Sequence, residues 1–317
     1  MGEEMQGVEE DTGWRKAIPE ARDRLQSRTL VGVVGFLLIL ETAACFRQPF
    51  FPWGAGGSDE PILLAKIAGI SVAFACLVLV LRAATAAGAL FGGLICLILL
   101  SGTTSFRFTL VRSGLAPLAL LFVLTFLSTR AGRTKKAKAG LVEKRGRSAA
   151  QVIANLSTAA LSVSSVGLVV VMRDRLCCGT LYFQMWAYPA MMVMCLAALV
   201  EATADTVSSE IGQAFGGVPV MLVGLRRVDV GTDGAVTLVG SGAGIVAGAL
   251  VATVGVWALR LSALDGVIVF LAGICGLFFD SLLGATVERR GWLGNDLVNF
   301  SSTVFAAGVA LGARWWI

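Results

Sequence analysis

Long apolar segments dominate the chain and limit the folds that it can adopt. Hydrophobic residues make up 56% of the 317 residues and charged residues only 15%, whereas charged residues are about 25% of a typical soluble domain. Segments such as 30–40, 67–81 and 235–259 are too long and too apolar for an ordinary soluble core. Too little polar sequence remains to cover the surface of a soluble helical protein. The sequence therefore predicts an all-α, polytopic bundle of transmembrane helices.

The apolar segments predict about nine spans, each close to the roughly 20 residues that cross a bilayer. They are residues 30–46, 62–81, 84–101, 109–128, 150–171, 185–205, 235–259, 266–285 and 297–313. The expected regions are a tail over 1–28 with a surface helix around Trp14, transmembrane helices over 29–129, a basic loop over 130–148, and transmembrane helices over 149–317. Two glycine series, Gly88/Gly92 and Gly240/Gly244/Gly248, have the four-residue spacing that lets helix backbones approach closely.

Lysine and arginine set the predicted orientation, because loops rich in these residues face the cytoplasm. The loop after the fourth span holds a dense basic cluster: Arg130, Arg133, Lys135, Lys136, Lys138, Lys144, Arg145 and Arg147. Counting spans from this loop also places the N-terminus, the 206–234 loop and the turn at Arg289–Arg290 in the cytoplasm. The first residues are too acidic for a signal peptide. In a bacterium the protein would lie in the plasma (inner) membrane.

The basic loop could also indicate nucleic-acid binding. Topology and contact with anionic lipid explain it better, so we expect membrane lipids and no nucleic acid as partners. A homodimer is a further expectation.

The chain contains no histidine. This excludes Ser-His and Cys-His nucleophilic catalysis and histidine ligation of metals. Seven cysteines are present without the spacing of a zinc site. Five are expected to pack as small apolar residues, and Cys177–Cys178 are neighbours in a loop. Any catalysis must use carboxylates, amides, hydroxyls, lysine, arginine or a bound metal.

Acidic motifs occur at the predicted cytoplasmic ends of three spans. They contain Glu201, Asp205 and Glu210, then Asp233, then Asp280 and Glu288. A carboxylate beside hydrocarbon is costly without a partner, a cation or water. Glu41, inside the first span, also needs a partner for its carboxylate, and the sequence identifies none.

Helical spacing groups these polar residues on shared faces. Side chains four residues apart lie on one face of a helix, which aligns Arg147, Gln151 and Asn155; Glu201, Asp205 and Ser209; Asp280 and Glu288; and Asn295 and Asn299. Interhelical hydrogen bonds use the same residue types, so this alternative stays open for the amides. Carboxylate and amide oxygens without histidine or thiolate suit Mg²⁺. We expect Asp205 and Asp280 as its ligands, with Glu210 and Asp233 next.

A glycine-rich string, Gly231-Thr232-Asp233-Gly234, precedes the seventh span. At a helix start, its backbone N–H groups could bind a phosphate, although such a string is also typical of an ordinary turn. Arg147 can supply positive charge to phosphate oxygens, whereas Arg226 and Arg227 are better explained by topology.

Taken together, these strings resemble one integral membrane family. The resemblance is carried by Arg147–Asn155, Ala204–Gly212, Val230–Gly240, Asp280–Thr286 and Asn295–Asn299, in that order, and covers roughly residues 85–317. The family includes the chloroplast phytyl-phosphate kinase of vitamin E synthesis, and it is more distantly similar to phytol and dolichol kinases and membrane cytidylyltransferases. Leu156 and Val207 depart from its pattern, which commonly has glycine and tryptophan there.

The resemblance implies Mg²⁺-dependent transfer of a phosphate from CTP, or another nucleoside triphosphate, to an isoprenyl (phytyl-like) monophosphate. The site residues expected on this basis are Asp205, Asp280, Glu210 and Asn155 for catalysis, and Arg147, Gln151, Gly231, Thr232, Asp233, Gly234, Asn295 and Asn299 for binding. The alternatives are lipid cytidylyltransfer, a transporter of a lipid or small molecule, and a scaffold without catalysis. The acids lie at the ends of spans rather than at their centres, which disfavours a transporter.

Overall fold

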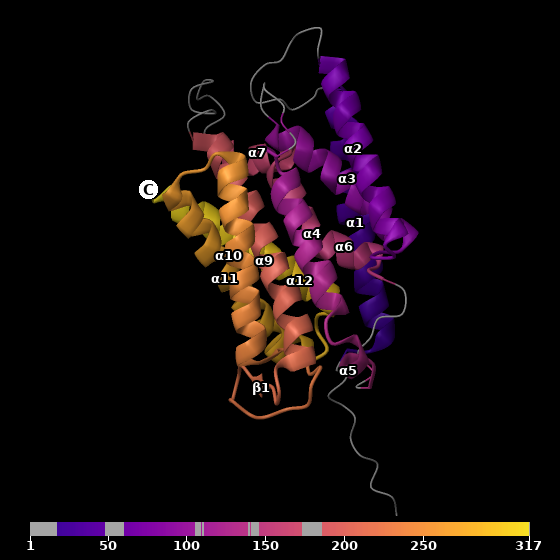
Figure 1. Ribbon diagram of the computed structural model, residues 1–317, viewed down its shortest axis with the longest axis vertical. Coiled ribbons are helices and arrows are strands. Elements are labelled where there is room, and N and C mark those ends of the chain that lie inside the picture. Colours follow the sequence, from indigo (N-terminus) through magenta and orange to yellow (C-terminus); the bar gives the residue numbers. More distant parts are fainter. Residues whose placement is uncertain are drawn as a thin grey trace, which may run out of the picture.

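The computed structural model describes residues 18–47, 60–104, 109, 111–138, 140, 146–172 and 186–316. Within them the fold is a bundle of helices with one small hairpin (Figure 1). The elements are α1 (Glu20–Arg47), α2 (Glu60–Val80), α3 (Ala86–Thr103), α4 (Leu115–Arg130), α5 (Arg133–Lys138), α6 (Ala149–Ser162), α7 (Ser165–Met172), α9 (Tyr188–Phe215), β1 (Val220–Met221), β2 (Ala235–Val236), α10 (Leu238–Leu259), α11 (Ala263–Leu283), the π-helical turn η2 (Gly284–Glu288) and α12 (Asn295–Trp315). Strands β1 and β2 pair antiparallel.

The predicted all-α membrane bundle is confirmed, with fewer full-length spans than expected. Among the described residues, seven helices are long and apolar enough to cross a membrane: α1, α2, α3, α9, α10, α11 with η2, and α12. Helices α6 and α7 make an eighth span only as a pair, bent by 59°. Helix α4 is apolar but has 16 residues. The fourth and fifth of the nine predicted spans are thus a short helix and a broken one.

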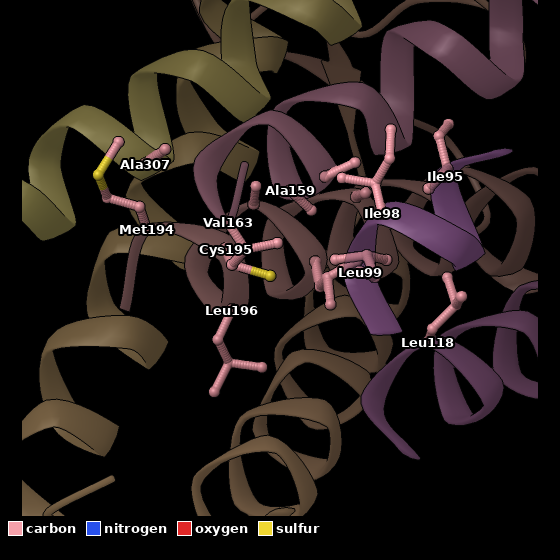
Figure 2. Close-up of a cluster of buried hydrophobic side chains, with 14 of the residues drawn as sticks. Ile95, Ile98, Leu99, Leu118, Ala159, Val163, Met194, Cys195, Leu196 and Ala307 are labelled. Carbon is pink, nitrogen blue, oxygen red and sulfur yellow. The ribbon is translucent and has the colours of Figure 1, made fainter. Parts of the chain in front are cut away.

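Helix α9 is the centre of the bundle. Its span is 94% buried, and it packs against α4, α6, α10, α11 and α12. Figure 2 shows the apolar cluster around it, in which Cys195 and Leu196 of α9 lie near Leu99 of α3 and Val163 at the α6–α7 break. Burial of this kind makes α9 a fixed axis from which polar side chains can be positioned.

The close helix approach predicted from the second glycine series, Gly240/Gly244/Gly248, is confirmed by the packing of α10 on α9. A Cβ atom added to Gly244 would lie 2.5 Å from the Ala204 carbonyl oxygen, and one added to Gly240 would lie 2.5 Å from the Ser208 carbonyl oxygen. The backbones of the two helices therefore touch along this stripe.

For the first glycine series, the predicted close approach of helix backbones is found at Gly88 but not at Gly92. A Cβ atom on Gly88 would lie 2.7 Å from the Arg147 carbonyl oxygen, which is a close backbone contact. On Gly92, the nearest neighbour would be the Phe74 ring at 4.0 Å. A side chain at Gly92 would therefore meet the Phe74 ring of α2 at an ordinary contact distance and not a helix backbone.

Helix α1 begins inside the region expected to be a tail. Its first turns bind the α11–α12 connection: Arg22 donates to the Gly291 carbonyl at 2.7 Å, and Ser27 donates to Asp296 at 2.6 Å. Further along α1, the buried Glu41 accepts hydrogen bonds from the hydroxyl and backbone N–H of Ser165, at 2.5 and 3.3 Å. Trp14 and Cys177–Cys178 lie outside the described residues.

Candidate functional site

A cavity of ≈ 1040 Å³ lies at the end of the bundle that carries α5 and the β1–β2 hairpin, which we call the α5 end (Figure 1). Helices α2, α3, α4, α6, α9, α11 and α12 all contribute to its walls. The cavity brings together every site residue expected from the sequence: Arg147, Gln151, Asn155, Asp205, Glu210, Gly231, Thr232, Asp233, Gly234, Asp280, Asn295 and Asn299.

Asp205 and Asp280 form the acidic centre of the cavity. Asp205 lies on α9 and Asp280 near the end of α11, and their carboxyl groups interact directly. Ser302 of α12 donates a hydrogen bond to Asp280 at 3.1 Å, and the positive charge of Arg147 acts on Asp205. Both aspartates are half-buried because they face the cavity.

Glu201 is a third acid that our list of site residues omitted. It lies one turn before Asp205 on the same face of α9, is 1% exposed, and interacts with Asp205 and Ser302. Within the described part of the chain, its Oε2 atom is buried without a hydrogen-bond partner. Gly276 of α11 makes room for it, since an added Cβ atom would lie 2.5 Å from Glu201 Cγ. The four-residue spacing from Asp205 was the signal that could have identified it.

Glu210 does not join the aspartate pair, contrary to our expectation of a metal ligand. Its Oε1 atom accepts from the Thr129 hydroxyl at 3.0 Å, and its Oε2 atom accepts from Lys136 Nζ at 2.6 Å. Five residues of α-helix turn a side chain by about 140° relative to Asp205. Among the described residues, no group of three or more acidic or thiol side chains is arranged to hold a metal ion. The candidate ligands are therefore a pair of aspartates.

The arginine of the site is positioned by the α2–α3 turn. Arg147 N–H donates to the Ala83 carbonyl at 3.0 Å, and Thr85 N–H donates to the Arg147 carbonyl at 3.0 Å. Gly146 adopts a positive φ of 71° in this contact, where a side chain would be strained. The backbone contact fixes the base of Arg147 beside α9, with its guanidinium 3.5 Å from the Thr206 hydroxyl.

Gln151 and Asn155 have structural partners as well as places in the cavity wall. Gln151 completes a capping box with Ser148 at the start of α6, and this stabilises the helix that follows Arg147. The Asn155 amide donates to the Gln151 carbonyl at 2.8 Å. These bonds lie within α6, whereas the structural alternative considered from the sequence was hydrogen bonding between helices.

The Gly231–Gly234 string lines the cavity as a turn, not as a helix start. Helix α10 begins later, at Leu238, with Thr237 as its N-cap. Gly234 has a φ of 73°, and a Cβ atom on it would lie 2.0 Å from the Ala285 nitrogen of η2. The string therefore packs against the end of α11, and the expectation of a helix N-terminus at this point was wrong.

Basic side chains surround the acidic centre. Basic residues that line the cavity include Arg82, Arg130, Arg133, Lys136 and Arg147. Arg226 and Arg227 do not line it. Two carboxylates with adjacent cations can bind a divalent ion on one side and phosphate oxygens on the other.

Comparison with known proteins agrees with the resemblance drawn from the sequence. Similar proteins include an uncharacterized membrane protein of Synechocystis sp., 31% identical over 205 residues (63% of this chain and 73% of that protein). Protein VTE6, chloroplastic, of Arabidopsis thaliana is 28% identical over 221 residues (67% of this chain and 61% of that protein). An uncharacterized membrane protein of Methanocaldococcus jannaschii is 32% identical over 184 residues (58% of this chain and 68% of that protein).

No solved structure matches the chain significantly. The family model described as integral membrane protein DUF92 matches residues 69–307, a range that contains all of the candidate site residues. The chain therefore belongs to the DUF92 family of integral membrane proteins.

Proposed function

We propose that this protein is a membrane lipid-phosphate kinase, which transfers the terminal phosphate of a nucleoside triphosphate to an isoprenyl monophosphate. The observation that supports this best is the convergence of Asp205, Asp280 and Arg147 on one cavity at the end of an apolar bundle. Carboxylates, a basic rim and adjacent apolar helices are what a charged nucleotide and a lipid phosphate require.

The residues of the cavity fit a magnesium ion. Mg²⁺ is usually held by one or two carboxylates together with substrate phosphates and water, and the Asp205–Asp280 pair supplies two carboxylates. The buried Glu201 lies beside the pair, and within the described part of the chain its Oε2 atom has no hydrogen-bond partner. When bound, the ion would neutralise charge on the phosphates. Arg147 and the lining residues Arg82, Arg130 and Arg133 would bind phosphate oxygens that the ion does not contact.

The proposed reaction does not need histidine. An oxygen of the lipid monophosphate forms a bond to the terminal phosphorus of the donor, and the bond from that phosphorus to the bridging oxygen breaks, which releases the nucleoside diphosphate. The acceptor oxygen is already largely ionised at neutral pH, because the second pKa of a phosphate monoester is about 6. No general base is required, and the work of the protein is positioning and charge stabilisation.

The finer identity of the substrates rests on the family resemblance. The chloroplast phytyl-phosphate kinase in the family suggests an isoprenyl, phytyl-like acceptor, and the distant likeness to cytidylyltransferases suggests CTP. The basic loop supports a cytoplasmic position for the α5 end, where nucleotides are available.

Product analysis with purified protein in lipid nanodiscs tests the proposal. CTP labelled in its terminal phosphate should yield labelled isoprenyl diphosphate and CDP, only with Mg²⁺ present. Label that is retained only from the α-phosphate, with release of pyrophosphate, would identify a cytidylyltransferase. Movement of lipid or solute across liposomes without nucleotide, together with no product of either kind, would identify a transporter.

A further inference from the structure

One wall of the cavity is apolar. It is formed by side chains of α2 and α4: Phe74, Val78, Leu79, Leu121, Phe122 and Phe126. Asp205, Asp280 and Arg147 line the same cavity. A cavity with one charged and one apolar wall suits a ligand with a charged head and a hydrocarbon tail.

Helices α2 and α4 meet at two levels only a few turns apart. At the first level, the rings of Phe74 and Phe122 are 5.6 Å apart in an edge-to-face arrangement. At the second, nearer the α5 end, Arg130 donates to the Leu81 carbonyl at 3.1 Å. Elsewhere α2 packs mainly on α3, and α4 packs mainly on α9 and α10. We call the region between these two contacts the α2–α4 window.

The α2–α4 window leads from the cavity to the outer, apolar surface of the bundle. Leu79 lines the cavity and is also 42% exposed. Its apolar neighbours on the outer faces of the two helices are exposed too: Leu77, Val80, Val123 and Leu127. In a membrane such a surface contacts hydrocarbon, so the window joins the cavity to the bilayer.

Gly92 of α3 lines the cavity next to the α2–α4 window and has no side chain. Gly92 of α3 is buried, yet a Cβ atom added to it would meet only the Phe74 ring at 4.0 Å. At Gly88, one turn away on the same helix, the corresponding distance to the Arg147 carbonyl is 2.7 Å. The space beside Gly92 is therefore unfilled, and it is continuous with the cavity.

Charge at the rim of the window complements a phosphate head. The Arg130 guanidinium lies 3.9 Å over the Phe126 ring and is tied to the α2 terminus through Leu81. Arg147 lies deeper, beside Asp205. A phosphate that enters from the bilayer surface would meet both cations before it reaches the aspartates.

We infer that the α2–α4 window is the lateral portal through which the lipid monophosphate reaches the aspartates, and that the space beside Gly92 receives its hydrocarbon tail. This inference rests on the proposed function for the identity of the head group. It assigns Gly92, Phe74 and Phe122 as residues that determine which tails are accepted.

Photo-cross-linking tests the portal independently of catalysis. The probe is an alkyl monophosphate with a diazirine in its tail, added to the full-length protein in phosphatidylcholine nanodiscs. Mass spectrometry should locate cross-links on residues 74–79 and 121–126. Excess unlabelled alkyl monophosphate should abolish them, whereas the phosphatidylcholine present in every sample should not.

Matched glycine variants make the test specific. Gly92→Phe should reduce cross-linking in the window by roughly tenfold or more, because the ring would fill the space that the tail occupies. Gly92→Ala should retain it, since a methyl group fits at this position. Gly69→Phe, on the exposed face of α2 with nothing within 4 Å, should also retain it and controls for folding, together with size-exclusion profiles.

Cross-links spread evenly over all lipid-facing helices, or unaffected by Gly92→Phe, would overturn the portal. If window cross-links are found but no nucleoside triphosphate supports phosphate transfer in the presence of Mg²⁺, the portal stands and the kinase proposal fails. If turnover is measured and Gly92→Phe leaves the use of every tail length unchanged, the kinase proposal stands and the portal fails.

Discussion

Three carboxyl groups of α9 and α11, those of Glu201, Asp205 and Asp280, lie close enough to interact with one another. Ser302 donates to Asp280 and interacts with Glu201, which in turn lies one helical turn from Asp205. Ordinary packing does not explain this concentration of acid, since burying a charge costs several kcal/mol. Under the proposed function, a bound cation would offset the repulsion among these groups.

Replacing Glu201 with glutamine tests this interpretation. Glutamine keeps the shape but replaces the carboxyl group beside Asp205 and Asp280 with an amide that cannot ionise when the ion binds, so the Mg²⁺ concentration for half-maximal activity should rise several-fold. The thermal stability should stay the same or increase, because an amide costs less to bury than an ionisable carboxyl group. The measurements are an Mg²⁺ titration of turnover and a melting curve.

Glu20→Gln is the matched control for that variant. Glu20 forms an exposed i,i+4 ion pair with Arg24, and such pairs contribute little, so neither the Mg²⁺ requirement nor the melting temperature should change. An unchanged Mg²⁺ requirement in Glu201→Gln would show that Glu201 does not act on the ion.

Spacing rules predicted which residues share a face, and no more than that. They aligned Glu201 with Asp205, and Asp280 with Glu288, because each rule applies within a single helix. The expectation that Asp205 and Asp280 share a site came from their position at the predicted cytoplasmic ends of their spans. The spacing rules could not predict that Lys136 would form an ion pair with Glu210, since these two residues are 74 positions apart in the sequence. The turn at Gly231–Gly234 was misplaced for a similar reason, because packing against Ala285 of η2 decides its shape.

At the scale of elements, an ion pair between Lys136 and Glu210 ties α5 to the bundle, beside a cation–π contact of Lys135 with Phe215. Lys136 Nζ donates to Glu210 of α9 at 2.6 Å and to the Thr129 carbonyl at the end of α4 at 2.8 Å. The two side chains of the pair are 3% and 21% exposed. This contact fixes the start of the basic loop beside the cavity.

Lys136→Met should destabilise the protein by about 2 kcal/mol, because it leaves the partly buried Glu210 carboxylate without its cation. Melting curves in detergent would measure the loss, and proteolysis within residues 130–148 should become faster. The double variant Lys136→Met/Glu210→Gln should recover part of the stability. If the double variant is no more stable than the single variant, the ion pair is not what anchors α5.

The contact between α9 and α10 provides a second prediction at this scale. Gly244→Ala should lower the stability by about 1–3 kcal/mol, because the new methyl group would lie 2.5 Å from the Ala204 carbonyl oxygen. Gly242→Ala, on the open face of the same helix, should be neutral or gain up to about 1 kcal/mol from helix propensity. Equal melting temperatures for the two variants would contradict the close approach of the helices.

The break between α6 and α7 could not be predicted from the sequence. Residues 150–171 contain no charged residue, and no proline marks the 59° bend between α6 and α7. In the structure the bend coincides with Ser165, whose backbone and hydroxyl bind Glu41 of α1. Such a break depends on a partner from a distant helix, and periodicity within one segment cannot reveal it.

For the whole molecule, the ends of the described chain lie at opposite ends of the bundle. Helix α1 starts against the α11–α12 turn at the α5 end, whereas Arg314 near the end of α12 pairs with Asp265 at the start of α11. The predicted membrane bundle could be read from composition, because hydrocarbon requires long apolar helices. The arrangement around α9 required the structure.

The orientation in the membrane is a prediction at this scale. If the basic α5 end faces the cytoplasm, a fluorescent protein fused at the N-terminus should fold and fluoresce in bacterial cells. Alkaline phosphatase fused at the C-terminus should be active, because that end would lie outside. An inactive phosphatase together with a fluorescent protein that folds at the C-terminus would place the site on the wrong side for nucleotides.

The measurement that tests our central claim most directly is manganese binding to Asp205→Asn and Asp280→Asn in nanodiscs with nucleotide, followed by electron paramagnetic resonance. Both aspartates should be needed for the bound-ion signal, and both variants should lose turnover by roughly 100-fold or more while keeping the wild-type melting temperature. A bound-ion signal and turnover that survive unchanged in either variant would contradict the claim that the two carboxylates share one divalent ion.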